Sequence, residues 1–398
     1  MKGIRKVTDG IYWIGGSDRR LERFENIFPI PEGVSYNSYF IDDEKTAVFD
    51  TADISVADQY LENLGEALSG KKLDYLVVLH MEPDHCSQIA NVAALFPEVT
   101  VVGSKQTFTF MEQFFPEAAG FKRLEVKEGD TLSTGKHTFK FVAAPMVHWP
   151  EVLFAYDEAS KALLSADAFG TFGALDGGLF ADEYDFEKDF LPSARRYYAN
   201  IVGKYGVQVQ AVLKKAAGLD IGMILPLHGP VWRKDLAWFL DKYNKWSTYE
   251  FESDDAIVVY GSLYGHTASA AEAVAASLRS KSGGNVRVYD VSGTDVSYLI
   301  GEVWRCRKIV LICPTYNNGI YTPMENFLSD MAALGVQNRV FALGQNGTWA
   351  PVTVKLMTDK LSQLKNVTIL EETLTIKSAL HASDENALNI FADAIVKA

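Results

Sequence analysis

Seven side chains of the types that bind metal ions stand out in the first part of the chain. They are His80, Glu82, Asp84, His85, His148, Asp167 and His228. The first four lie within six residues, whereas the other three are far apart in the sequence. Four imidazoles and three carboxylates are enough to hold two metal ions with one carboxylate bridging them. We therefore predict a dinuclear metal site.

The candidate ligands follow mostly apolar runs, which are typical of buried strands. These runs are residues 73–79, 139–145, 162–166 and 221–227. They end at or shortly before His80, His148, Asp167 and His228. A single His in such a place is more often a core or surface residue, and a single Asp, such as Asp84, can be a helix cap. The coincidence of four strand ends with a clustered His-x-Glu-x-Asp-His instead favours ligands held on rigid supports.

Three polar loops form a second candidate site in the C-terminal part. Expected strands at 256–260, 285–291, 308–314, 338–343 and 367–376 alternate with helices, which predicts a doubly wound parallel sheet. The first loop contains Ser262, Leu263, Tyr264, Gly265, His266 and Thr267. The second contains Pro314, Thr315, Tyr316, Asn317, Asn318 and Gly319, and the third Gly344, Gln345, Asn346, Gly347, Thr348 and Trp349. Each loop alone could be an ordinary turn, but together they lie where open α/β sheets bind ligands.

The first of these loops suits a phosphate group. It carries hydroxyls and leads directly into a helix, whose N–H groups and dipole can hold a dianion without Lys or Arg. It lacks the Gly-x-Gly-x-x-Gly pattern, so NAD fits less well. Tyr316 and Trp349 are candidates for stacking on an aromatic ligand.

The metal-ligand pattern resembles that of the flavodiiron proteins, also called A-type flavoproteins, which include rubredoxin:oxygen oxidoreductases and enzymes that oxidise the reduced deazaflavin coenzyme F420. Metallo-β-lactamase-fold hydrolases use His-x-His-x-Asp-His and usually bind zinc, whereas Glu82 occupies the second His position here. A carboxylate in place of an imidazole makes the site more anionic and favours iron. The resemblance implies that His80, Glu82 and His148 hold one iron and that Asp84, His85 and His228 hold the other. It makes Asp167 the bridge.

The C-terminal loops resemble those of flavodoxin, whose phosphate loop is Ser/Thr-x-Thr-Gly-x-Thr. Tyr264 replaces the middle Thr of that pattern. The resemblance implies that FMN binds with its phosphate at the first loop and its isoalloxazine between the other two. The third loop of the family is often Gly-x-Tyr-Gly-Trp; here Asn346 takes the Tyr position and Trp349 lies one residue later.

The resemblance covers nearly the whole chain. It predicts an α/β protein with a metallo-β-lactamase-like αββα sandwich over residues 1–250, followed by a flavodoxin-like doubly wound sheet over 254–398. It implies an enzyme in which FMN and two iron ions reduce O₂ to water, with reduction of NO to N₂O as the alternative. It also implies a head-to-tail homodimer, or a dimer of dimers, and a separate electron donor, either rubredoxin or reduced F420. Some members have a pocket His near the N-terminus; here Glu25 takes that position.

Composition limits the other classes. The net charge of −13 over 398 residues argues against nucleic acid and anionic membrane surfaces as partners. No apolar leader and no apolar run of about 20 residues occurs, so we expect a cytoplasmic protein. The three cysteines include no Cys-x-x-Cys, which excludes a built-in rubredoxin-type iron site. Two alternatives stay open, a zinc hydrolase with a passenger flavodoxin-like domain and a non-catalytic electron carrier. Glu82 argues against the first, and the complete ligand set argues against the second.

Overall fold

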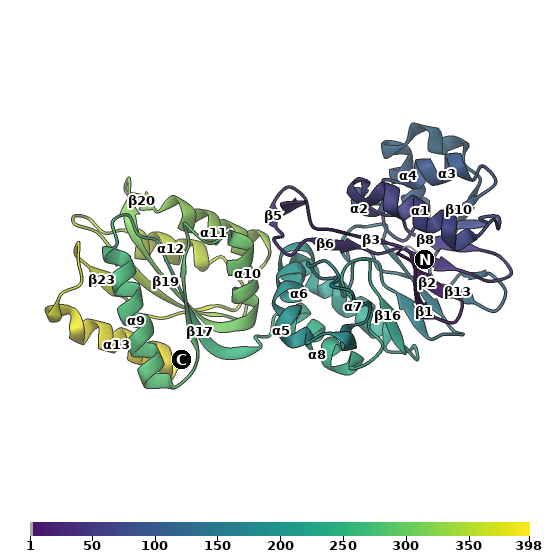
Figure 1. The fold of residues 1–398 in the computed structure, drawn as a ribbon. Helices are drawn as coiled ribbons and strands as arrows, with labels where there is room; N and C mark the ends of the chain where they lie inside the picture. Colours follow the sequence, from purple (N-terminus) through teal and green to yellow (C-terminus); the bar gives the residue numbers. More distant parts are fainter. Residues whose placement is uncertain (1–2) are drawn as a thin grey trace. The chain divides into compact units, whose positions relative to one another are not determined.

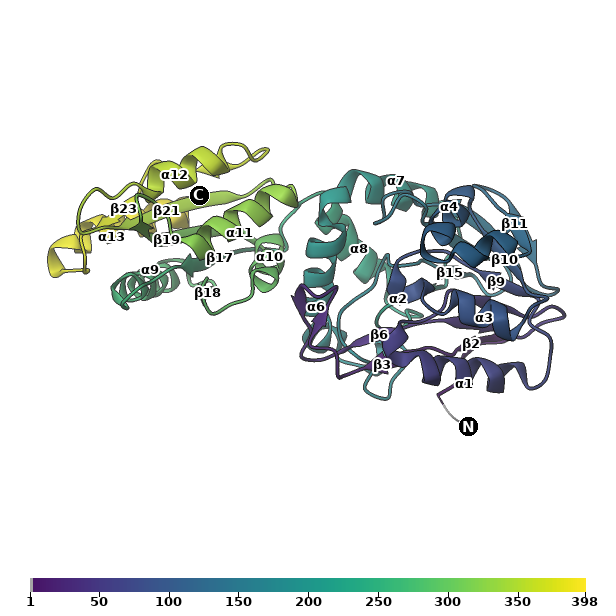
Figure 2. The same cartoon turned by 90° about the horizontal axis from the view of Figure 1, so that it is seen from above.

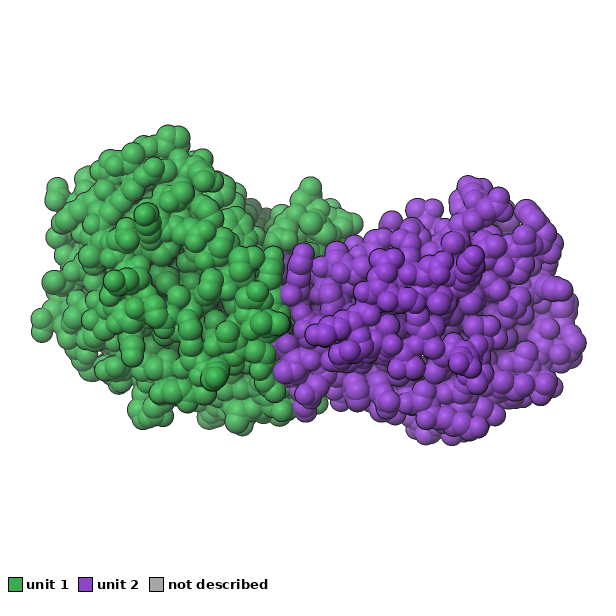
Figure 3. Space-filling model, turned by 180° about the vertical axis from the view of Figure 1, so that it is seen from behind, with its two compact units in different colours: residues 1–198, 205–244 green, residues 199–204, 245–398 purple. Residues whose placement is uncertain are grey.

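The computed structural model describes residues 3–398 and divides the chain into two compact units (Figures 1 and 3). Unit 1 comprises the chain up to Tyr198 together with Tyr205–Asn244. Unit 2 comprises Ala199–Lys204 and Lys245–Ala398. The short segment Ala199–Lys204 therefore belongs with the second unit although the chain around it folds with the first. The domain limits at 250 and 254 stay a prediction.

Unit 1 contains two β-sheets with helices outside them (Figures 1 and 2). The first sheet has the order β1 (Arg5–Thr8), β2 (Ile11–Trp13), β7 (Tyr39–Ile41), β8 (Ala47–Phe49), β9 (Tyr75–Val77), β10 (Thr100–Gly103) and β11 (Arg123–Glu125). The second has the order β12 (Thr131–Ser133), β13 (Thr138–Ala143), β14 (Leu153–Asp157), β15 (Ala162–Leu164) and β16 (Met223–Leu225). Strands β7, β8, β14 and β15 are buried at every residue. Burial on both faces is what a sheet between a second sheet and a helix layer requires.

The helices of unit 1 connect these strands. Around the first sheet lie α1 (Ala57–Leu68), α2 (Pro83–Cys86), α3 (Ile89–Leu95) and α4 (Lys105–Phe114). With the second sheet lie α5 (Phe186–Asp189), α6 (Leu191–Tyr197), α7 (Gly206–Ala216) and α8 (Leu236–Ser247). The order of layers is helix, sheet, sheet, helix. The predicted αββα sandwich is confirmed.

Several predicted elements are shorter or divided. Residues 35–41, rich in aromatic side chains, predict a single strand. The structure divides it into β6 (Val34–Tyr36), which pairs with β3 (Gly16–Asp18), and β7. Asn37 separates them because its N–H donates to the carbonyl of Leu227 instead of a strand neighbour. The sequence from Trp232 to about Trp246 predicts one helix, but the helix begins only at Leu236. Trp232 pairs instead with Ile224 in an isolated β-bridge.

Unit 2 is one parallel sheet with helices on both faces (Figure 1). The order is β18 (Val286–Asp290), β17 (Ser253–Tyr260), β19 (Cys306–Tyr316), β21 (Val340–Asn346) and β22 (Thr368–Ile369). The expected strand 367–376 is divided into β22 and β23 (Leu374–Ile376), and both pair with β21. A short β20 (Gly319–Ile320) folds back on β19. This order with one reversal of direction is that of flavodoxin.

The helices of unit 2 cover the sheet unequally. On one face, α9 (His266–Ser282) and α13 (Glu385–Lys397) pack onto a core that includes Val258, Val310 and Phe391. The other face carries α10 (Val296–Arg305), α11 (Thr322–Ala333) and α12 (Thr353–Leu361). The predicted doubly wound fold is confirmed. Within residues 3–398 the structure has no helix whose length and apolar character would let it cross a bilayer.

Candidate metal centre and cofactor cavity

The seven side chains predicted as ligands meet in unit 1 as two groups. One group is His80, Glu82, His148 and Asp167, and the other is Asp84, His85 and His228. Within each group the ligand atoms lie within 4.8 Å of one another. All seven residues are at most 9% exposed.

The first group converges on Glu82 and one oxygen of Asp167. The Nε2 atom of His148 lies 3.0 Å from Glu82 Oε2 and 3.1 Å from Asp167 Oδ2. His80 Nε2 lies 3.2 Å from the same Glu82 oxygen and 3.5 Å from Asp167 Oδ2. Two imidazole nitrogens and two carboxylate oxygens therefore surround one point.

The second group faces the other oxygen of Asp167. His85 Nε2 lies 3.0 Å from His228 Nε2 and 3.0 Å from Asp167 Oδ1. Asp84 Oδ2 lies 3.3 Å from His85 Nε2 and 3.2 Å from His228 Nε2. Asp167 thus presents Oδ2 to one group and Oδ1 to the other, which is the arrangement of a bridging carboxylate.

Unsatisfied oxygens show that the centre fits cations. Both oxygens of Asp84 and the Oδ1 of Asp167 are buried and have no hydrogen-bond donor among the residues that the structure describes. Their close neighbours are imidazole nitrogens that would themselves ligate a metal ion, and a buried carboxylate costs several kcal/mol unless a positive charge compensates it. A pair of metal ions between the groups would supply that compensation.

The protonation of the imidazoles follows from the same carboxylates. Burial alone would lower the pKa of His148, but its hydrogen bonds with Asp167 and Glu82 raise it to about 9. Burial also opposes the charged form of His85, and the charges of Asp84 and Asp167 raise its pKa to about 9. Burial would raise the pKa of Asp167, yet the neighbouring imidazoles hold it well below its usual range. Without metal, the charges of the centre are therefore paired by protons that a metal ion would displace.

The ends of neighbouring parallel strands bring these loops together. Strands β8 and β9 run parallel, as do β15 and β16, so their carboxyl ends lie at the same edges. Asp50, directly after β8, accepts hydrogen bonds from the backbone N–H groups of Leu79 and His80 at 2.8 and 3.1 Å. Thr51 follows and donates its hydroxyl to the carbonyl of His85 at 2.6 Å. The β8 end thus holds both ends of the His80–His85 segment.

The sequence did not predict the residues that contact the Nδ1 atoms of these imidazoles, on the side opposite the centre. His80 Nδ1 lies 2.9 Å from Oε1 of Glu151, and His228 Nδ1 donates to the carbonyl of Ser35 at 2.8 Å. Asn37 donates to the carbonyls of Pro226 and Gly229 on either side of His228. The only sequence signal for Glu151 is its place three residues after His148.

Glu25 lies on a hairpin turn beside the centre. Strands β4 (Arg23–Phe24) and β5 (Phe28–Pro29) pair, and Glu25 and Asn26 between them have positive φ values of 50° and 56°. The residue is solvent-exposed as a whole, but its carboxyl is near enough to Glu82 to be affected by that charge. Burial of the carboxyl and the charge of Glu82 raise the pKa of Glu25 to about 8. The turn therefore adds a carboxyl near Glu82.

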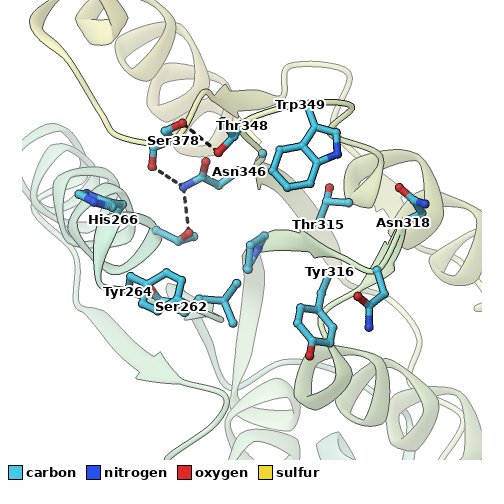
Figure 4. A pocket seen from close by; sticks show the side chains of 15 residues that line it. Ser262, Tyr264, His266, Thr315, Tyr316, Asn318, Asn346, Thr348, Trp349 and Ser378 are labelled. Atoms are coloured by element: carbon cyan, nitrogen blue, oxygen red, sulfur yellow. Dashed lines mark hydrogen bonds between the residues drawn. The ribbon is translucent and has the colours of Figure 1, made fainter.

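Unit 2 has a cavity of about 560 Å³ at the carboxyl ends of its strands (Figure 4). All three predicted loops contribute to it. The lining residues are Ser262, Leu263, Tyr264, His266, Thr267, Pro314, Thr315, Tyr316, Asn317, Asn318, Asn346, Gly347, Thr348, Trp349 and Ser378. Ser378 was not predicted; it follows the divided strand whose second half, β23, reaches this edge.

Four residues of the predicted loops do not line the cavity. Gly265 forms the left-handed turn before α9, with a φ of 92°, and Gly319 belongs to β20. Gly344 packs against Ile312, where an added Cβ would lie 3.1 Å from the nearest side-chain atom. Gln345 turns its amide to Thr375 at 3.1 Å. These positions shape the backbone around the cavity.

The cavity suits a phosphate-bearing aromatic ligand. The Ser262 hydroxyl accepts from the N–H groups of Gly265 and Ala268, so it closes the loop onto the start of α9. The first-turn N–H groups of that helix have no acceptors within the helix. Tyr264 and Trp349 are 91% and 78% exposed, although aromatic side chains of this size are usually covered. A bound planar ring system would cover such side chains.

Comparison with known proteins follows this division of the chain. Residues 34–229 match the family model described as ODP family beta lactamase, and residues 258–388 match flavodoxin. The nitric oxide reductase of Moorella thermoacetica is 30% identical over 93% of this chain and 92% of its own. The crystal structure of the flavodiiron protein from Giardia intestinalis superimposes with a TM-score of 0.92 at 27% identity, over 100% of this chain and 96% of that one.

A further solved structure matches the chain over nearly its whole length. The rubredoxin oxygen:oxidoreductase of Desulfovibrio gigas matches with a TM-score of 0.91 at 26% identity, over 99% of this chain and 98% of that chain. Fold and sites together define an oxidoreductase built from a β-lactamase-like metal domain and a flavodoxin domain. The chain belongs to the flavodiiron protein family. Its cofactors are those of the family, FMN and a pair of iron ions, and the resemblance predicted from the ligand pattern is confirmed.

Proposed function

We propose that this protein reduces O₂ to water, and that the seven residues of the metal centre are the iron ligands. In this assignment His80, Glu82 and His148 hold one iron, Asp84, His85 and His228 hold the other, and Asp167 bridges them. The observation that carries the proposal is the orientation of Asp167, whose two oxygens face two separate groups. When bound, FMN and the iron pair supply the electron transfer.

The protein residues supply position and protons. The two groups hold their ligand atoms close together, which favours binding a small molecule between two metal ions. The aromatic side chains of Phe24, Trp149 and Tyr197 lie 5.3–5.6 Å, ring centre to ring centre, from His228 or His80 and limit access of water. Glu25 is the polar side chain that we propose lines the substrate pocket next to Glu82.

Reduction of NO to N₂O is the second candidate. Its support is the similarity to the Moorella relative, whose name is nitric oxide reductase. Both activities use the same cofactors, so the substrate preference must come from the pocket. The presence of Glu25 there, in place of the His of some relatives, is the feature of this chain that bears on it.

Gas consumption separates the two candidates. The purified protein, loaded with FMN and iron and reduced anaerobically, is supplied with O₂ or NO at an electrode. We expect rapid O₂ loss without hydrogen peroxide. Rapid NO loss with slow O₂ loss would instead make the protein an NO reductase. Zinc in the centre with hydrolytic activity and no flavin would contradict both.

The electron donor and the assembly complete the proposal. We propose that rubredoxin or reduced F420 delivers electrons to FMN at the cavity, where Trp349 and Tyr264 are exposed. We also propose a head-to-tail homodimer, alone or as a dimer of dimers, in which FMN of one protomer serves the iron pair of its partner. Cys86, Cys306 and Cys313 are buried and form no disulfide among the described residues, which agrees with the cytoplasmic location that we propose.

A mixed dimer tests transfer between protomers. One chain carries Asp167→Ala and the other carries Ser262→Ala with Trp349→Ala, and the two are co-purified with different tags. If transfer runs between protomers, the mixed dimer consumes O₂ faster than either parent dimer. An inactive mixed dimer that still contains FMN and iron would contradict the proposed arrangement.

A further inference from the structure

Glu151 lies behind the metal centre and contacts only one of its imidazoles. Its Oε1 atom is 2.9 Å from Nδ1 of His80 and accepts a hydrogen bond from the N–H of Met81 at 2.8 Å. The side chains of Glu151 and His80 are both fully buried. Its Oε2 atom has no hydrogen-bond partner within residues 3–398. One oxygen of this buried carboxylate therefore contacts His80 and Met81, and the other has no hydrogen-bond partner among the described residues.

The other imidazoles are held differently. Nδ1 of His228 donates to the backbone carbonyl of Ser35 at 2.8 Å, which is a neutral partner. Nδ1 of His85 is buried and has no partner among the described residues. Thus the first group contains an imidazole backed by a carboxylate, whereas the two imidazoles of the second group are backed by a carbonyl or by nothing.

This difference changes the electron donation to the two metal ions. A carboxylate that accepts a hydrogen bond from the outer nitrogen of a ligating imidazole makes the inner nitrogen more basic and fixes the tautomer. It also adds negative charge to a buried region, where charges interact more strongly than in water. A more anionic environment stabilises the ferric over the ferrous ion.

We propose that Glu151 is a positioning residue that makes the two iron sites electronically unequal. The iron held by His80, Glu82 and His148 is then the harder of the two to reduce. Starting from two ferric ions, the first electron from the donor would then be held at the metal position of the second group, and the second electron at the position beside His80. The half-reduced centre would keep its ferric ion in the first group. This inference rests on the ligand assignment of the proposed function.

Glu151→Gln is the direct test, since glutamine keeps an accepting oxygen but removes the charge. The holoprotein is titrated with dithionite, a one-electron reductant in its dissociated form, while electron paramagnetic resonance follows the mixed-valent signal at defined potentials. We expect two irons per chain as in the wild type. The potential of the second reduction step should rise more than that of the first, and the maximal mixed-valent signal should decrease. Unchanged potentials, or a larger change in the first step, would overturn the proposal.

Asp50→Asn is the matched control. Asp50 is also fully buried, and it also holds the first group, but through the backbone N–H groups of Leu79 and His80 rather than the imidazole. We expect a smaller change in the separation of the two steps in this variant than in Glu151→Gln. Equal changes in both variants would show that any nearby charge suffices and would overturn the role of the imidazole contact.

Two measurements guard against a variant that fails to fold or to bind iron. Glu151→Asp keeps the charge on a shorter side chain, and it should recover part of the wild-type separation that Gln loses. In the half-reduced wild type, Mössbauer spectra should show one ferric and one ferrous ion with trapped valences; a delocalised pair would overturn the proposal. If the wild type binds no iron pair, or consumes neither gas, the failure belongs to the proposed function instead.

Discussion

The metal centre and the FMN cavity hold their functional groups in opposite ways. The seven residues of the centre are at most 9% exposed, and their ligand atoms already lie within 4.8 Å of one another in each group. The cavity lies open at the edge of a sheet, and its large aromatic side chain Trp349 is 78% exposed. A buried set of charges needs its ions for compensation, whereas an exposed aromatic cavity loses little when it is empty. Metal loss should therefore disturb unit 1 more than flavin loss disturbs unit 2.

Asp167→Ala should produce the largest effect, because it removes one oxygen from each group at once. We expect loss of at least one iron per chain and a fall in gas turnover of at least about 100-fold, with FMN retained. Metal analysis and the flavin absorbance of the same sample measure both. Asp220→Ala, which removes an exposed partner of Lys161, is the control and should change neither. Unchanged turnover in Asp167→Ala would refute catalysis at the metal ions.

Metal affinity should depend strongly on pH. The pKa values of His85 and His148 are both about 9 in the absence of metal, so both imidazoles carry protons at pH 7. Since a metal ion binds only the neutral form, lowering the pH from about 8 to 7 should weaken binding by up to ~10-fold for each proton displaced. Competition with a chromophoric chelator under anaerobic conditions measures this. A pH-independent affinity over that interval would show that the imidazoles are already neutral.

Trp349→Ala should have an intermediate effect confined to unit 2. Loss of one stacking side chain costs about 1–1.5 kcal/mol, so FMN should bind roughly 10-fold more weakly. Fluorescence of free FMN on titration with apoprotein gives the dissociation constant. Ile390→Ala, which shortens an exposed side chain on α13, is the control. A loss of iron in Trp349→Ala would contradict the independence of the two sites.

The difference between the metal centre and the cavity also explains which parts of each could be predicted from the sequence. The candidate metal ligands could be singled out because four of the chain's seven histidines lie in or near a clustered His-x-Glu-x-Asp-His or after an expected strand, and folding brings such strand ends to an edge. The cavity loops were predictable from strand order alone, because parallel strands place their carboxyl ends together. The boundaries of the strands were harder to predict. Strands β9 and β16 contain three residues each where seven were expected, because pairing ends where the neighbouring strand ends.

The residues that support the ligands could not be predicted. Asp50 acts on His80 because β8 and β9 are neighbours, a pairing of segments about thirty residues apart that no local pattern specifies. Glu151 is likewise an acidic loop residue until tertiary packing places it behind His80. Ser35 contributes a backbone carbonyl, which every residue has. Such contacts depend on the three-dimensional arrangement rather than on residue type.

Glu25→Gln should produce the smallest change, and that change should be confined to the metal centre. The residue is exposed as a whole, so water can replace part of its interaction with Glu82, and the proposed iron ligands stay in place. We expect full iron and FMN content, with the ratio of O₂ to NO turnover changed by less than about 10-fold, well below the loss of a buried catalytic acid. Electrode rates for both gases, compared with the exposed control Glu22→Gln, measure the ratio. A loss of both activities by more than about 100-fold would make Glu25 an essential proton donor rather than a pocket residue that adjusts preference.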